Sequence, residues 1–111
     1  MGLRAMLALE RQFPADCLLL TYEALSAAPQ AQAARLFGFL GVDACHEVLE
    51  ACVDATRFEA LTGGRRAGDA RDGAFLRFGA PGAWTEVFTP DLADLALQET
   101  GWAFERFGWV T

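Results

Sequence analysis

The spacing of apolar residues predicts a mostly helical chain. Apolar positions recur every three or four residues, the period of one helix face, in four stretches. Proline and glycine mark their ends, because the residue before a proline disfavours the helical region and glycine readily adopts the left-handed conformation after a helix. The predicted helices begin near Leu3, Ser26, Asp43 and Pro90, and the end signals are Phe13-Pro14, Gly41 and, after about residue 107, Gly108.

One stretch departs from this helical pattern. Residues 17–22 read Cys-Leu-Leu-Leu-Thr-Tyr, a continuous apolar run that is typical of a strand buried on both faces, as in a parallel sheet. We therefore expect one core strand here. A single strand cannot satisfy its own hydrogen-bonding groups, so its partner strands must lie elsewhere.

Length and composition limit the class of protein. The 111 residues are enough for one small domain, and 53% of them are apolar, so we expect some apolar surface to meet another element. The net charge of −6 argues against general nucleic-acid binding. Charged residues interrupt the apolar N-terminal stretch, and no secretory or membrane-spanning segment is predicted.

The three cysteines suggest neither a metal site nor a disulfide. Cys45 and Cys52 lie seven residues apart on a predicted helix, which separates them by roughly 10 Å, beyond disulfide reach. Together with Cys17 they are expected to be reduced, buried thiols in a cytosolic protein. The one histidine, His46, is interpreted as a solvated surface residue.

The stretch with the most distinctive chemistry is residues 75–89, Phe-Leu-Arg-Phe-Gly-Ala-Pro-Gly-Ala-Trp-Thr-Glu-Val-Phe-Thr. Arg77 offers a planar set of donors that matches a phosphate, and glycine lets backbone N–H groups near Gly79 and Gly82 approach a ligand closely. This arrangement predicts an anion site. The plainer alternative is a Gly/Pro loop with packed aromatic rings and a solvated arginine. Thr89 and Pro90 suit the start of the last helix.

This stretch resembles the 3′-phosphate-binding segment of sulfotransferases that use 3′-phosphoadenosine 5′-phosphosulfate (PAPS). The family pattern is roughly Phe-x-Arg-Lys-Gly-x-x-Gly-x-Trp-x-x-x-Phe-Thr, and the chain departs from it at Phe78, where lysine is usual. Weaker similarities extend over about residues 17–109: Tyr22-Glu-Ala-Leu25 after the strand, Phe39-Leu-Gly41 at a helix end, and Thr56-Arg-Phe58 before the loop. The matching positions are Phe75, Arg77, Gly79, Gly82, Trp84, Phe88 and Thr89.

The resemblance implies a nucleotide site. Arg77 and the Gly79 N–H would hold the 3′-phosphate, Tyr22 and Thr56 would contact the adenine, and the Phe58 ring would stack on it. Each position also has a structural alternative: Tyr22 and Phe58 as packing residues, and Thr56 as the first residue of a Thr-x-x-Glu capping box. Trp84 and Phe88 are interpreted as packing residues. Phe78 removes one cation, which weakens nucleotide binding unless Arg65 or Arg66 replaces the charge.

The resemblance also implies a fold and a reaction. The family has a P-loop-like α/β fold, and the chain corresponds to its mostly helical C-terminal part with one core strand, so residues 1–111 form a partial domain. The family reaction transfers a sulfuryl group from PAPS to a hydroxyl or amine acceptor without a metal. The family's phosphosulfate loop, catalytic base and lysine lie upstream of this part, so we expect the chain to be a fragment that is inactive alone.

Two other classes of function are considered. The first is a non-enzymatic helical interaction module whose apolar faces meet each other or a partner chain; it predicts a well-folded chain that does not respond to adenosine 3′,5′-bisphosphate. A sulfotransferase fragment is instead expected to expose apolar surface through which the chain can self-associate. The second, a nucleotide kinase, requires a phosphate loop that the sequence does not contain.

Overall fold

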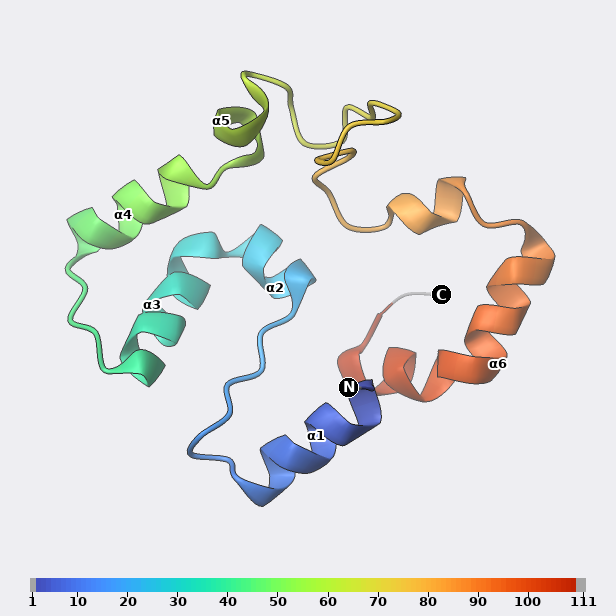
Figure 1. The fold of residues 1–111 in the computed structure, drawn as a ribbon, viewed down its shortest axis with the longest axis horizontal. Helices are drawn as coiled ribbons and strands as arrows, with labels where there is room; N and C mark the ends of the chain where they lie inside the picture. The colour runs from blue at the N-terminus through green and yellow to red at the C-terminus, as the bar shows by residue number, and fades with distance from the viewer. Residues whose placement is uncertain (1, 110–111) are drawn as a thin grey trace. The chain divides into compact units, whose positions relative to one another are not determined.

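The computed structural model describes residues 2–109, whose helices belong to two units, Met1–Pro81 and Gly82–Thr111 (Figure 1). The first unit contains five helices and the second contains a 3-10 helix and one long helix. Their bounds are α1 Leu3–Gln12, α2 Tyr22–Ala27, α3 Pro29–Leu40, α4 His46–Ala55, α5 Phe58–Thr62, η1 Ala83–Glu86 and α6 Pro90–Phe107.

In the first unit, helices that follow one another along the chain pack together: α2 against α3, α3 against α4, and α4 against α5. Thr21 caps α2, since its Oγ1 accepts a hydrogen bond of 3.2 Å from the Ala24 N–H. Pro29 begins α3, and Gly41 ends it with a φ of 68°. The helix-end prediction at Gly41 is confirmed. Helices α2 and α5 and the loop that follows α5 all belong to this first unit.

Three predicted helix starts are wrong. Ser26 lies inside α2, and α3 begins only after Ala28. Cys45, and not Asp43, precedes α4, and it makes no side-chain cap. Thr56 does not form a capping box: its hydroxyl donates to the carbonyls of Cys52 and Val53, at 2.9 and 3.2 Å. Thr56 therefore ends α4, because carbonyls without helical partners at a helix C-terminus are the nearest acceptors for its hydroxyl.

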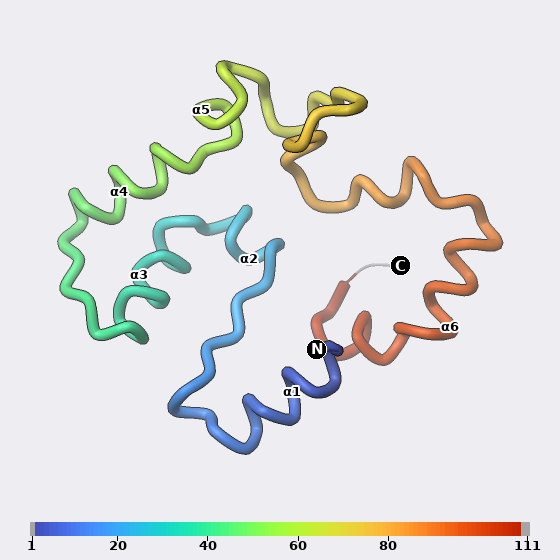
Figure 2. Tube along the Cα trace, in the orientation of Figure 1, coloured from blue at the N-terminus to red at the C-terminus, as the bar shows by residue number. Residues whose placement is uncertain are grey.

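The predicted core strand is not formed. No residue between 2 and 109 belongs to a strand; residues 17–21 are irregular, and Tyr22 already begins α2 (Figure 2). Leu18, Leu19 and Leu20 are half-buried. An apolar run becomes a strand only when neighbouring strands pair with its backbone, and the described part of the chain offers it none.

The second unit confirms the prediction for the last helix. Thr89 caps α6 by accepting from the Leu92 N–H at 3.4 Å, Pro90 is the first helical residue, and Gly108 ends the helix with a φ of 67°. Aromatic rings join η1 to α6: the Trp84 ring lies 5.5 Å from that of Phe88 and 6.2 Å from that of Phe104, both edge-on. Trp84 and Phe88 are packing residues here, as expected.

Little of the apolar content forms a core. Among residues 2–109 the buried apolar side chains are Leu7, Val53 and Ala103, whereas many large apolar side chains, including Tyr22, Leu40 and Phe75, are exposed. Much apolar surface is therefore left uncovered in the described part of the chain, and its contact with another element stays a prediction. The thiols differ from prediction: Cys45 and Cys52 are exposed, and Cys17 is half-buried. All three are free.

Candidate functional site

A pocket of about 740 Å³ lies in the first unit, and all five residues predicted to bind a nucleotide line it. The walls come from α2, from the junction of α4 and α5, and from the loop that follows α5. The lining is mainly apolar. The lining residues are Tyr22, Leu25, Ser26, Pro29, Val53, Thr56, Arg57, Phe58, Glu59, Leu61, Ala67, Phe75, Leu76, Arg77, Gly79, Ala80 and Pro81.

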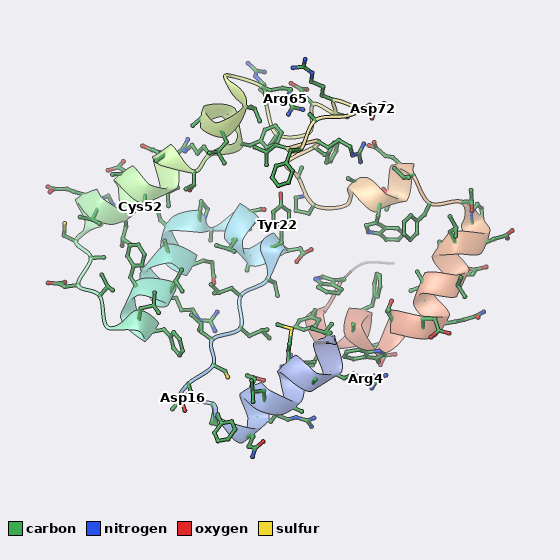
Figure 3. The ribbon with its side chains drawn as sticks, viewed as in Figure 1. Arg4, Asp16, Tyr22, Cys52, Arg65 and Asp72 are labelled. Atoms are coloured by element: carbon green, nitrogen blue, oxygen red, sulfur yellow. The ribbon has the colours of Figure 1, made fainter. Side chains whose placement is uncertain are left out.

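Three aromatic side chains contribute to this lining, Tyr22 and Phe58 from different helices and Phe75 from the loop. Tyr22 is the first residue of α2, and its side chain is exposed (Figure 3). Phe58 is the first residue of α5 and is half-buried. Aromatic rings bind the flat, apolar faces of nucleobases by stacking, which is energetically favourable with any base. The pocket therefore has surfaces that suit a base, on two elements far apart in the sequence.

Gly79 lies directly against the Phe58 ring. A Cβ atom at Gly79 would lie 2.1 Å from Cδ2 of Phe58, far inside van der Waals contact, and the φ of Gly79 is 70°. Any other residue would face both a left-handed backbone and the ring. Among residues 2–109 the Gly79 N–H donates to no protein acceptor. Glycine is thus required at this position by packing, and its N–H is available to a ligand.

Arg77 lines the same pocket with a guanidinium that is only loosely paired. Its Nη1 lies 3.8 Å from Oδ1 of Asp72, and the Asp72 side chain is 99% exposed. Such a pair at the surface contributes little, because water screens both charges. The backbone of Arg77 is held more firmly: its carbonyl accepts from the Arg71 N–H at 3.1 Å and from Nη1 of Arg65 at 2.8 Å. Arg77 therefore combines a fixed main chain with a guanidinium that can exchange Asp72 for another anion.

The two residues considered as substitutes for the family lysine do not line the pocket. Arg65 directs its guanidinium to backbone carbonyls of the loop, and Arg66 is not among the lining residues. Phe78 is also absent from the lining; its carbonyl accepts from the Gly68 N–H at 2.7 Å. The charge missing at Phe78 is therefore not replaced in the pocket from Arg65 or Arg66.

Sequence reasoning missed two charged lining residues, Arg57 and Glu59. Arg57 connects α4 to α5, and its Nε lies 2.9 Å from Oδ1 of Asp54. The sequence could have indicated them, because Arg57 and Glu59 are the chain neighbours of Thr56 and Phe58, which were predicted to bind the nucleotide. With Arg57 and Arg77, the lining contains two guanidinium groups and one carboxylate.

Other kinds of site were also considered within residues 2–109. No group of three or more His, Cys, Asp or Glu side chains there could hold a metal ion. No helix in the same range is both long enough and apolar enough to cross a membrane. His46 lies on α4 outside the pocket, exposed, with its Nδ1 3.8 Å from Oε2 of Glu50.

A comparison with protein families extends the interpretation beyond the pocket. Residues 5–100 match the model of the sulfotransferase domain. The chain belongs to the sulfotransferase domain family. Neither a comparison with curated proteins nor one with solved structures found a match.

The family match covers more of the N-terminus than the resemblance described above, and less of the C-terminus. It begins in α1, includes the irregular residues 17–21, and ends in α6. Every residue that lines the pocket lies inside the matched range. The sulfotransferase similarity and the pocket therefore concern the same part of the chain.

Proposed function

We propose that the pocket is the adenine and 3′-phosphate side of a PAPS site. The observation that carries this proposal is the convergence of Tyr22, Thr56, Phe58, Arg77 and Gly79 on one pocket, although α2, the junction of α4 and α5, and the loop supply them separately. Membership of the sulfotransferase domain family supports it, since the resemblance of residues 75–89 implies a reaction that moves a sulfuryl group from PAPS to an acceptor hydroxyl or amine.

Each group in the pocket suits one part of this nucleotide. The Tyr22 and Phe58 rings are surfaces for the adenine. The Arg77 guanidinium offers charge-assisted hydrogen bonds to the 3′-phosphate, and the Gly79 N–H is a further donor to it. The Thr56 hydroxyl already donates to α4 carbonyls, so its contribution is mainly to hold the α4–α5 junction and hence Phe58.

The 111-residue chain alone is proposed to bind the nucleotide without transferring the sulfuryl group. Transfer needs a base for the acceptor hydroxyl and positive charge at the bridging oxygen. Of the charged lining groups, Arg77 serves the 3′-phosphate and Arg57 pairs with Asp54 at 2.9 Å, which leaves the Glu59 carboxylate and no further guanidinium for the bridging oxygen. Transfer by the purified chain, with PAPS and a mixture of phenol, alcohol and amine acceptors, would refute this part of the proposal.

Calorimetric titration with adenosine 3′,5′-bisphosphate tests the binding site. We expect Arg77→Ala to weaken binding by about tenfold or more, because a charge-assisted hydrogen bond to the phosphate is lost. The affinity for adenosine 5′-monophosphate, which lacks the 3′-phosphate, should fall much less in the same variant. Arg35→Ala is the matched control: it removes the same charge from α3, outside the pocket, and should change neither affinity.

Two results would contradict the proposal. If the folded wild-type chain does not bind the bisphosphate, the pocket is not a nucleotide site. Equal losses for both nucleotides in Arg77→Ala would show that Arg77 does not distinguish the 3′-phosphate. With either result, the pocket would have to be explained by a different ligand.

Exposed apolar side chains favour a second candidate, a helical interaction module that binds a second copy of the chain. Phe39, Leu40, Val42 and Val48 are all exposed on α3, on α4 or between them. Burial of such side chains is the main favourable term in association. Sedimentation over a range of concentrations tests this, and a monomer throughout that range would exclude self-association. Because the nucleotide titration is independent of this result, the two functions can be separated.

A further inference from the structure

Arg65 lies on the loop that follows α5 (Figure 3). Its side chain makes three hydrogen bonds to the backbone of that loop. Its Nη1 donates to the carbonyls of Asp69, at 3.1 Å, and Arg77, at 2.8 Å, and its Nη2 donates to the carbonyl of Leu76. The Arg77 and Asp69 contacts join parts of the loop that are separated in sequence. A planar guanidinium with several donors in a rigid arrangement can make all three bonds at once.

The same guanidinium also lies over the Phe58 ring. Its Cζ is 5.0 Å from the ring centroid, a distance at which a cation is attracted to an aromatic face. The Phe58 ring in turn lies against Gly79. Arg65 therefore contacts two of the segments that contribute the proposed nucleotide groups: the start of α5, at Phe58, and the phosphate-binding segment, at Leu76 and Arg77.

The backbone around Arg65 strengthens this connection. The Thr62 hydroxyl donates to the carbonyls of Phe58, at 2.7 Å, and Arg65, at 3.2 Å, which holds the start of the loop to α5. Further along, the Gly68 and Arg71 N–H groups donate to the carbonyls of Phe78 and Arg77. The result is that residues 65–71 are bonded to residues 76–78 by both main chain and side chain.

We propose that Arg65 is a positioning residue for the phosphate-binding segment: it fixes the main chain at Leu76 and Arg77, so that the Arg77 guanidinium and the Gly79 N–H face the pocket. Arg65 itself does not bind the phosphate. The expected effect on nucleotide affinity rests on the proposed function. The structural part of the inference, that Arg65 holds residues 76–78 to residues 65–71, can be measured without any nucleotide.

The nature of the replacement decides between positioning and direct binding. A lysine keeps the charge but presents one ammonium group, which cannot reproduce a planar fork bonded to three carbonyls and stacked on a ring. If Arg65 bound the phosphate as a charge, Arg65→Lys would keep most of the affinity. If Arg65 positions the segment, we expect Arg65→Lys and Arg65→Ala both to weaken bisphosphate binding by about tenfold, the loss typical of charged hydrogen bonds.

A double-mutant comparison tests whether Arg65 acts through Arg77. In an Arg77→Ala background, the change Arg65→Lys should have a much smaller effect than in the wild type, because the guanidinium that it positions is gone. Arg66→Ala is the matched control on the same loop, since Arg66 does not line the pocket, and it should leave the affinity unchanged.

Amide hydrogen exchange, followed by NMR without ligand, supplies the independent readout. In Arg65→Lys the Gly68 and Arg71 amides should exchange faster, while amides in the middle of α3 keep their wild-type rates. Faster exchange throughout the chain would indicate general destabilisation and would overturn the proposal, as would unchanged exchange at Gly68 and Arg71. If the wild type binds no nucleotide, the proposed function fails, but the exchange result still decides whether Arg65 holds the segment.

Discussion

Gly79→Ala tests the packing on which the pocket depends. Gly79 has a φ of 70°, and a Cβ atom there would lie 2.1, 2.4 and 2.5 Å from three atoms of the Phe58 ring. Ordinary carbon contacts are about 3.5–4.0 Å, so the ring must move by more than an ångström or the loop must shift. Either movement takes Phe58 or the phosphate segment away from its place in the pocket.

Two contributions set the size of the effect. A left-handed conformation costs an alanine about 1–2 kcal/mol relative to glycine. Forcing a methyl group into an occupied space typically costs about 1–3 kcal/mol. We therefore expect Gly79→Ala to lower the free energy of unfolding by about 2–5 kcal/mol, the sum of these ranges, unless the loop relaxes.

Gly73→Ala is the matched control, because Gly73 has a φ of 77° in the same loop and no atom within 4 Å of its Cβ position. It should cost only the conformational term. Urea unfolding followed by far-ultraviolet circular dichroism measures both variants. In a Phe58→Ala background the difference between Gly79→Ala and Gly73→Ala should disappear, since the ring is gone. Equal costs in the wild-type background, within about 0.5 kcal/mol, would refute the contact between Gly79 and Phe58.

Two further substitutions test polar groups near the pocket. Asp72→Asn removes a carboxylate that lies 3.8 Å from Arg77, so bisphosphate affinity should rise by about two- to threefold at low salt and little at high salt; calorimetry at two salt concentrations measures this, and weaker binding would mean that Asp72 supports the site. Thr56→Val removes the hydroxyl bonded to the Cys52 and Val53 carbonyls, so the free energy of unfolding should fall by about 1 kcal/mol while bisphosphate affinity changes less than twofold. A tenfold loss of affinity would instead place the Thr56 hydroxyl at the adenine.

Local sequence signals determined both ends of α6 and the C-terminal ends of α1 and α3. Pro90 and Gly108 mark α6 where expected, and Thr89 caps it, because proline geometry, glycine's left-handed backbone and side-chain capping act over a few residues. The stop of α1 at Phe13-Pro14 has the same origin. The order of residues 75–89 was also enough to indicate the sulfotransferase family, which the family comparison then showed.

Tertiary structure decided the features that depend on distant partners. The apolar residues 17–21 were expected in a strand, yet the state of such a run is set by whether other strands pair with it, and none does within residues 2–109. Thr56 satisfied the sequence pattern of a capping box, but its backbone ends α4, and Arg57 takes the N-cap position of α5. Neither the irregular backbone of residues 17–21 nor the position of Thr56 at the end of α4 can be predicted from the local sequence pattern alone.

The pocket divides in the same way between sequence and structure. The residue types at Tyr22, Phe58 and Arg77 could be selected in advance, because aromatic rings and guanidinium groups have fixed chemistry wherever they lie. Their meeting in one pocket, the contact of Gly79 with Phe58 and the bonds from Arg65 to the Leu76 and Arg77 carbonyls could not. Those contacts depend on the path of the whole loop after α5, whose hydrogen bonds join residues about ten positions apart, beyond the range of any local sequence preference.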